Sequence, residues 1–213
     1  PFSKIPEDRR TATLSKPYGE QGFMNSLRVL HSEAATSFGG QEHRIYNEML
    51  AMRERGHILE AVCQPDALLT EHLRAEGFTV HTTFMDGPAN FVKGLATIRN
   101  ILKAGRFDVL NCHSRRDTMI AATAGRLAGT PLIVRTRHLA NKAGSLLSYT
   151  VIPHRVITVS DYVRKNLIDR GVRPGDIDTV FSPVQIPAAN GQSSLRTELG
   201  LASNDIVVGC VAV

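Results

Sequence analysis

Glycine, histidine and arginine residues follow several short apolar runs, at places where a ligand could be bound. Gly39 and Gly40 follow the first run and begin an amphipathic segment. Two glycines at a helix N-terminus let a phosphate approach the free backbone N–H groups, although a simple tight turn explains the same pair. The pattern is not G-x-G-x-x-G, which disfavours a dinucleotide site.

Histidine and arginine side chains follow the fourth and fifth apolar runs. His113 ends the run at 108–113 and precedes Arg115 and Arg116, and Arg135, Arg137 and His138 stand at or just after the end of the run at 131–136. A histidine there could donate a hydrogen bond or a charge to a sugar or a phosphate, and guanidinium groups suit a phosphorylated or acidic substrate. A helix cap or surface role for His113, and a solvated charged rim for the arginines, are the alternatives.

Motifs for other chemistries are absent from the sequence. There is no G-x-S-x-G, no P-loop and no H-E-x-x-H, and the eight histidines are scattered. The three cysteines, Cys63, Cys112 and Cys210, have no metal-type spacing and predict buried, reduced thiols. We therefore expect no nucleophilic Ser or Cys, no metal and no cofactor.

The elements that must position these residues alternate along the chain. Apolar runs predict strands at 27–31, 58–63, 78–82, 108–113, 131–136, 155–160 and 177–181. Amphipathic segments between them predict helices, including 41–55, one that Asp66 caps and that runs to Ala75, 117–127 and 161–170. Apolar strands separated by helices predict an α/β fold with a doubly wound, mostly parallel, Rossmann-like sheet. Ligands bind beyond the carboxyl ends of such strands, which places the residues above at one edge.

Changes in composition along the sequence divide the chain into four parts. Residues 1–25 are polar and aperiodic and predict a flexible extension or tag remnant, residues 26–186 one Rossmann-like domain, and 187–194 a Pro/Gly/Ser/Asn-rich linker. Residues 195–213 predict a short helix start and then a buried strand at 205–213, which we interpret as the truncated start of a second domain.

Composition and charge exclude several classes of protein. Of 213 residues, 42% are hydrophobic and 21% charged, as in a soluble globular protein. No apolar run of about 18 residues predicts a membrane span, and no secretory signal is visible, so we expect a cytoplasmic location. The net charge of +5 fits a phosphorylated substrate or an anionic membrane surface, or reflects solubility alone. Aromatic residues are sparse and not interleaved with basic ones, so we expect no nucleic acid partner.

Three segments together resemble the N-terminal domain of glycosyltransferase family 4, retaining enzymes of the GT-B fold in lipopolysaccharide and glycolipid synthesis. The segments are SFGGQEHRIYNEMLAMRERGH, DVLNCHSRRDTMIAATAGRLAGTPLIVRTRH and RVITVSDYVRKNLIDRGV, and the resemblance covers about residues 27–213. It implies a metal-independent transfer of a sugar from a nucleotide-sugar donor to a saccharide or lipid-linked acceptor. A peripheral contact with the anionic inner membrane is a further expectation.

The resemblance also implies roles for single residues. Gly39 and Gly40 match the glycine loop that approaches the donor diphosphate, and His113 matches a histidine near the donor sugar and the reacting centre. Arg137 and His138 match positions on the acceptor side, where we also expect Arg115 and Arg116.

Two features depart from the family pattern or fall outside the chain. Ser182 and Pro183 stand where the hinge of such enzymes usually reads Asn-Gly, which predicts a stiffer hinge. The main donor site of the family, with a basic pair and two glutamates, belongs to the C-terminal domain. We therefore expect this fragment to fold but to lack transferase activity.

Three other functions stay open, and so does the membrane contact. A nucleotide-sugar epimerase shares the two-domain architecture, and a non-catalytic sugar- or phosphate-binding module would need a secretory signal. A Rossmann-type oxidoreductase would need an acidic residue at the end of the second strand, where Asp66 is the nearby candidate. The segment SLLSYTVIP at 145–153, with Lys142 and Arg155, could contact a membrane or form an ordinary core helix.

Overall fold

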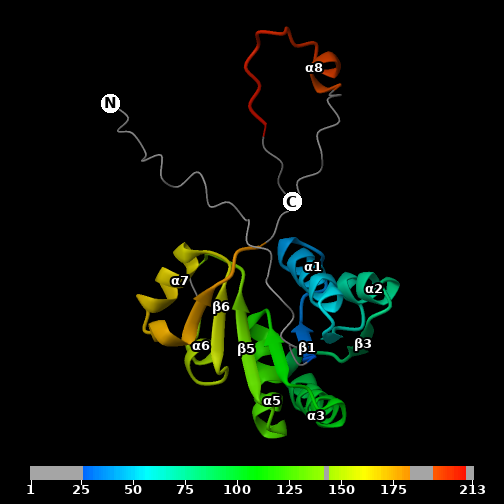
Figure 1. Ribbon diagram of the computed structural model, residues 1–213, viewed down its shortest axis with the longest axis vertical. Coiled ribbons are helices and arrows are strands. Elements are labelled where there is room, and N and C mark those ends of the chain that lie inside the picture. The colour runs from blue at the N-terminus through cyan, green and yellow to red at the C-terminus, as the bar shows by residue number, and fades with distance from the viewer. Residues whose placement is uncertain (1–25, 142–143, 183–193, 210–213) are drawn as a thin grey trace, which may run out of the picture.

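A single parallel sheet organises the molecule. The computed structural model describes residues 26–141, 144–182 and 194–209. Seven strands lie in the order β3-β2-β1-β4-β5-β6-β7, and each described neighbour pair is parallel (Figure 1). The strands are β1 Arg28–Glu33, β2 Ile58–Cys63, β3 Thr79–Thr82, β4 Val109–Cys112, β5 Leu132–Arg137, β6 Arg155–Thr158 and β7 Ile177–Thr179. This arrangement confirms the doubly wound, Rossmann-like fold expected from the sequence.

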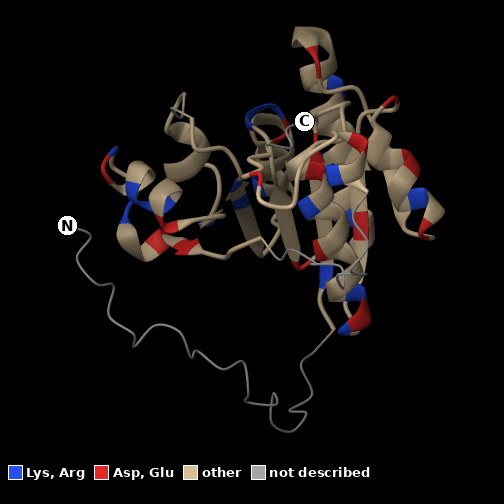
Figure 2. Ribbon diagram, turned by 90° about the horizontal axis from the view of Figure 1, so that it is seen from above, with Lys and Arg blue, Asp and Glu red and all other residues tan. Residues whose placement is uncertain are grey.

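Helices connect the strands, and acidic and basic residues are interspersed along them (Figure 2). Their bounds are α1 Gly40–Glu54, α2 Leu68–Ala75, α3 Gly87–Gly105, α4 Arg115–Asp117, the π-helical turn η2 Thr118–Ala122, α5 Thr123–Ala128, α6 Leu147–Thr150, α7 Asp161–Ile168, the 3₁₀ turn η3 Pro174–Asp176 and α8 Leu195–Glu198. Within the described ranges, no helix combines the length and the apolar character that crossing a bilayer requires.

The central strand β1 contributes to a hydrophobic core on each face of the sheet. Val29 packs in a cluster with Ile45 of α1 and Leu69 of α2. Its neighbour Leu30 packs in the other cluster, with Ile98 of α3. Because successive strand side chains point to opposite faces, the adjacent apolar residues Val29 and Leu30 are both buried, one in each core. Packing in these two cores fixes the position of the carboxyl ends of the strands, where the site residues lie.

Two helix starts differ from the prediction. Asp66 does not cap α2: the helix begins at Leu68, whose backbone N–H donates to Thr36 O at 3.1 Å instead. The helix predicted at 117–127 begins earlier, because Ser114 is the N-cap of α4, and the π-helical turn then interrupts it. Thr118 Oγ1 donates to the carbonyl of Ser114 at 2.5 Å, and such side-chain bonds to the preceding turn compete with regular helix geometry.

The strand predicted at 205–213 is not formed in its described part. Residues 205–209 have no strand structure, and Ile206 and Val208 are 93% and 92% exposed. A strand needs a neighbour to pair its backbone groups, and the described sheet ends at β7. The predicted extension 1–25, almost all of the linker 187–194, and Pro183, Lys142 and Cys210 lie outside the described residues.

Candidate functional site

The candidate site lies where β1 and β4 run side by side. The chain order reverses between these two strands, and the crevice at their carboxyl ends is where doubly wound sheets bind ligands. Glu33 ends β1, and His113 directly follows β4. The turns after β1, β4 and β5 therefore bring the sequence-predicted residues to one edge of the sheet.

A buried carboxylate, Asp117, joins these turns. Asp117 accepts hydrogen bonds from Ser32 Oγ at 2.9 Å, from the His113 backbone N–H at 2.8 Å, and from the N–H and Oγ of Ser114 at 2.7 and 2.6 Å. Burial raises the pKa of Asp117, while the Arg135 charge opposes that shift. Because four hydrogen-bond donors converge on Asp117, the turn stabilises its carboxylate form. Asp117 thereby fixes the backbone on which His113 stands.

Three histidines form a hydrogen-bonded file from the interior toward the surface. His31 Nδ1 lies 3.0 Å from His113 Nε2, and His113 Nδ1 lies 3.0 Å from His138 Nε2. The His31 and His113 rings are stacked at 5.2 Å and both residues are 1% exposed, whereas His138 is half-buried. His113 is therefore neither a helix cap nor a surface residue, and both of its ring nitrogens are engaged by other histidines.

The three histidines are neutral at pH 7. Burial lowers the pKa of His31, and burial together with the two neighbouring histidines lowers the pKa of His113 well below its usual value. Burial and the Arg44 charge lower the pKa of His138 to about 3. A neutral imidazole carries one proton, so each histidine can donate with one nitrogen and accept with the other. The file can thus carry one consistent direction of hydrogen bonds, and His31 Nε2 at its inner end has no hydrogen-bond partner in the described part of the chain.

Arg135 places a buried positive charge behind the histidines. Its side chain is among the largest that are fully buried, and its guanidinium carbon lies 5.5 Å from the centre of the Tyr149 ring. Nε and Nη1 have no hydrogen-bond partner among the described residues. The sequence suggested Arg135 as one of two guanidinium groups for a substrate, but its burial at 1% exposure prevents direct contact with solvent-borne ligands.

Glu33 is a second buried carboxyl group at the site. Its Oε1 accepts the backbone N–H groups of Ala34 and Ala35 at 2.7 and 2.8 Å, and Gln41 Nε2 donates to its Oε2. Burial, reinforced by the charge of Asp117, raises the pKa of Glu33 to about 8. Glu33 is therefore protonated at neutral pH. Among the residues that the structure describes, no three His, Cys, Asp or Glu side chains are grouped so that they could hold a metal ion.

The predicted glycine loop begins α1 at the same edge. Gly39 is the N-cap of α1, and its backbone N–H donates to Glu42 Oε2 at 2.8 Å. A Cβ added to Gly40 would meet nothing within 4 Å, so this position faces open space. The Glu42 carboxylate therefore already occupies one N–H of the loop, and an anion approaching it would meet Gly40 more directly than Gly39.

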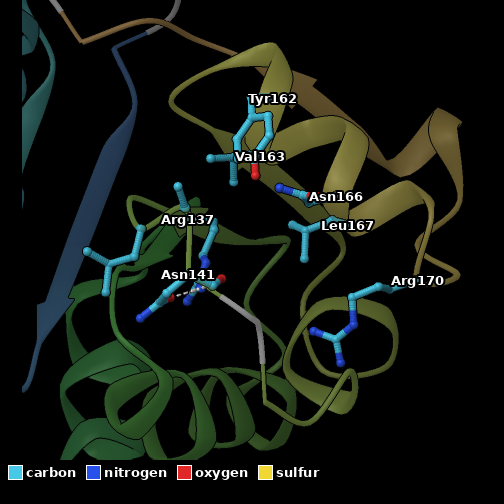
Figure 3. A pocket seen from close by; sticks show the side chains of 9 residues that line it. Arg137, Asn141, Tyr162, Val163, Asn166, Leu167 and Arg170 are labelled. Carbon is cyan, nitrogen blue, oxygen red and sulfur yellow. Dashed lines mark hydrogen bonds between the residues drawn. The ribbon is translucent and has the colours of Figure 1, made fainter.

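The predicted acceptor-side residues are divided between two hollows. Arg137 lines one of about 260 Å³ with Tyr162 and Asn166 of α7, and its Nη2 donates to Asn141 O at 2.8 Å (Figure 3). Arg115 and Arg116 line another, of about 760 Å³. The structure thus brings His113 and His138 together but keeps Arg137 apart from the other two arginines.

Four site residues were not singled out from the sequence: His31, Glu33, Arg44 and Asp117. Arg44 of α1 donates to Val180 O at 3.0 Å and to Ser182 Oγ at 2.7 Å, and so ties α1 to the segment after β7. A polar side chain inside an apolar strand, as His31 is, was the available signal. The cysteine prediction is confirmed for Cys63 and Cys112, which are free and buried.

Comparison with known proteins identifies the family. The sequence model of Glycosyltransferase Family 4 matches residues 38–186, more than half of the chain. No curated protein matches the chain. Among solved structures, a glycosyltransferase from Rickettsia africae ESF-5 matches with a TM-score of 0.68 and 17% identity over 84% of this chain and 51% of that one.

Two further structures are similar. The lipopolysaccharide outer core galactosyltransferase WaaB, in its apo form, has a TM-score of 0.63 and 19% identity over 76% of this chain and 47% of that one. Anabaena Alr3699/HepE, in complex with UDP and glucose, has a TM-score of 0.61 and 15% identity over 82% of this chain and 50% of that one. The chain thus spans about half the length of these proteins. At such identities the structures show the shared fold, and the family match over residues 38–186 shows that the chain belongs to glycosyltransferase family 4.

Proposed function

We propose that this chain is the N-terminal, acceptor-side half of a retaining glycosyltransferase. The enzyme moves a sugar from a nucleotide-sugar donor to a saccharide or lipid-linked acceptor in lipopolysaccharide or other cell-envelope glycan synthesis. The observation that carries the proposal is the carboxyl edge of β1 and β4, where the Gly39–Gly40 turn and the His113–His138 pair follow the strands of a family 4 domain. The UDP and glucose bound by the similar Anabaena protein support a nucleotide-sugar donor.

On the donor side, the start of α1 would meet the diphosphate. Backbone N–H groups at a helix N-terminus favour negative charge, and the open space at Gly40 admits a close approach. The Glu42 carboxylate must release the Gly39 N–H or be accommodated beside the diphosphate. As the leaving diphosphate gains charge during transfer, donors already aimed at it stabilise the transition state.

At the reacting centre, His138 is the member of the histidine file that can meet a ligand. Its Nε2 is bonded to His113, and its Nδ1 has no partner among the described residues. His113, which the family resemblance places near the donor sugar, is 1% exposed and would act by holding the tautomer and orientation of His138. A neutral imidazole can hydrogen-bond to a sugar hydroxyl without placing a positive charge in the crevice.

The acceptor would lie on the side of Arg115, Arg116 and Arg137. Guanidinium groups bind phosphate or carboxylate with paired hydrogen bonds. The proposal includes no metal cofactor, because backbone N–H groups and basic side chains would meet the charge of the leaving group. It also includes a cytoplasmic location and a peripheral contact with the anionic inner membrane.

The segment proposed for membrane contact is divided in the structure. Tyr149 of α6 is buried in a cluster with Val156 and Leu167, as an ordinary core helix would be. Leu147 and Val151 are 54% and 60% exposed and are the residues that could touch a lipid surface. Liposome binding that does not weaken as salt is raised would contradict an electrostatic contact.

A donor and acceptor screen with the full-length gene product tests the proposal. We expect release of the nucleoside diphosphate only when a suitable acceptor is present, with the sugar found on that acceptor in its original anomeric configuration. A nucleotide-sugar epimerase, the alternative with the same architecture, would instead change the sugar of the donor with no acceptor present. Inverted configuration would contradict the retaining mechanism.

A further inference from the structure

An open groove lies between the segment after β3 and the turn η2. Its volume is about 760 Å³, and its apolar wall is formed by Met85, Phe91, Met119 and Ile120. Met119 and Ile120 belong to η2, which begins five residues after His113 at the carboxyl edge of the sheet. A π-helical turn is rare and is found mostly at functional sites. We call this hollow the Met85–Met119 groove.

The start of α3 forms one side of the groove, through Gly87, Pro88 and Phe91. Gly87 turns the chain from β3 into α3 with a φ of +72°, a conformation that favours glycine. Apolar residues gathered at a hollow, rather than scattered singly, mark a place where an apolar group binds.

Two arginines at the same groove make no hydrogen bond or ion pair within the described part of the chain. Arg115 and Arg116 are exposed and line the groove, and neither has a hydrogen bond or an ion pair with any residue that the structure describes. By contrast, Arg137 in the other hollow is bonded to Asn141. Two unpaired guanidinium groups beside an apolar wall complement a molecule that is anionic at one end and apolar at the other.

We propose that the Met85–Met119 groove binds the acceptor as a long-chain phosphate ester, an inference that rests on the proposed function and names the class of its acceptor. The hydrocarbon chain lies on Phe91 and Met119, with the buried Met85 beneath them, and the phosphate is held by Arg115 and Arg116. A groove of this volume is in the range that holds one ligand molecule. The phosphate end then lies toward the turn that carries His113.

Methionine methyl groups give a direct test with the 213-residue chain. The chain has five methionines, of which Met85 and Met119 line the groove while Met49 and Met52 lie in α1. In a chain labelled with ¹³C-methyl methionine, decyl phosphate below its micelle concentration should shift the signals of Met85 and Met119 and leave those of Met49 and Met52 in place. Shortening the chain should weaken binding about fourfold per methylene. Inorganic phosphate alone should not produce these shifts.

Charge variants separate the two halves of the ligand. Arg115→Gln and Arg116→Gln should each weaken the binding of decyl phosphate about tenfold and leave the weaker binding of decanol unchanged. Lys103→Gln, which removes an exposed charge near the far end of α3, is the matched control and should change neither. Amide spectra of each variant check that the fold is intact.

Several results would overturn the inference. Equal affinity for decanol and decyl phosphate, undiminished binding in both arginine variants, or shifts of Met49 and Met52 of the same size would each do so. Binding to anionic vesicles with no shift of Met85 or Met119 would assign the arginines to a membrane surface instead. The test uses no nucleotide sugar. If the groove binds decyl phosphate as expected but the full-length enzyme shows no transferase activity, the proposed function is refuted and the binding inference is not.

Discussion

At the scale of single residues, the site is defined by buried groups whose protonation differs from their usual state. Glu33 is protonated at neutral pH, because burial raises its pKa to about 8 from 4.5. Between these two pH values the folded chain holds a proton that the unfolded chain has lost. The contribution of Glu33 to stability is therefore present at low pH and is lost as the pH rises through about 8.

Replacing Glu33 with Gln should remove this pH dependence. The amide keeps an oxygen for the backbone N–H groups of Ala34 and Ala35 and carries no charge at any pH. We expect Glu33→Gln to have a free energy of unfolding near that of the parent at pH 5, and to exceed it by a few kcal/mol at pH 9. Urea denaturation across this range measures the difference, and parallel curves for the two proteins would contradict the assignment.

His138 should act in the opposite direction. Its pKa is lowered to about 3 from 6.5, so between these values the unfolded chain binds a proton that the folded chain does not. Stability contributed by the neutral His138 is present above pH 6.5 and is lost as the pH falls toward 3. In His138→Gln, the loss of stability between pH 6.5 and 4 should be smaller than in the parent, as urea denaturation would measure. His57→Gln, at a position between α1 and β2 distant in sequence from the file, is the control and should follow the parent.

The sequence predicted His113 and His138 as site residues but not how they are joined. A histidine that comes at the end of a predicted parallel strand can be recognised in the local sequence, and its position at the carboxyl edge of the sheet follows from that. The file also needs His31, which stands 82 residues before His113 and meets it because β1 and β4 are neighbours. Asp117 and Glu33 were missed for the same reason: their burial and their mutual effect depend on which strands pair, which no local pattern contains.

At the scale of elements, Arg44 connects the first helix to the last strand of the sheet. Its side chain is 5% exposed and donates to Val180 O and Ser182 Oγ, 136 and 138 residues away. Since Ser182 stands at the predicted hinge, this contact holds the segment that leaves the domain against α1. Hydrogen bonds from a charged donor, such as these two, contribute most to the stability of the fold when they are partly buried.

Arg44→Met should loosen that segment while keeping the apolar stem. We expect the free energy of unfolding to fall by about 2–3 kcal/mol and the amide hydrogen of Val180, which bonds Thr158 O, to exchange faster. Arg53→Met, which removes a half-exposed arginine of the same helix paired with Glu76, is the control and should cost less than about 1 kcal/mol. Equal losses in the two variants would show that the Arg44 contact does not hold the segment.

Element positions followed closely from the sequence, and the exceptions have local causes. The strand at 58–63 is placed as predicted, because an apolar run bounded by helix-stop and turn residues leaves little freedom. The helix predicted at 117–127 is divided, because Ser114 and Thr118 bond to nearby backbone and set a different start and winding. Over its described residues, 205–209, the strand predicted at 205–213 does not form, because the apolar run has no neighbouring strand there to pair with.

At the scale of the whole molecule, the described domain is packed on both faces of its sheet, and the polar groups of the site lie at one edge. Hydrophobic clusters cover both faces of the sheet and the α6–α7 end, so the domain has the burial that cooperative folding requires. The charged and polar groups of the site are gathered at one edge, where the turns after β1, β4 and β5 meet. A ligand held at this edge alone would leave its other side in water.

The 213-residue chain should therefore fold but not transfer sugar. The proposal places the basic pair and the glutamate pair that bind the donor in a second domain, and a donor held by one side only would lack both orientation and exclusion of water. We expect a single cooperative urea transition for the chain, and no glycosylated product by mass spectrometry after prolonged incubation with donor and acceptor. The full-length enzyme should form product under the same conditions and should keep its rate in excess EDTA, since the proposal assigns the charge of the leaving diphosphate to backbone N–H groups and basic side chains. Product formed by the chain alone would place the donor site within these 213 residues. A rate that EDTA abolishes and a divalent cation restores would show that a metal ion, rather than backbone N–H groups and basic side chains, meets the charge of the leaving diphosphate.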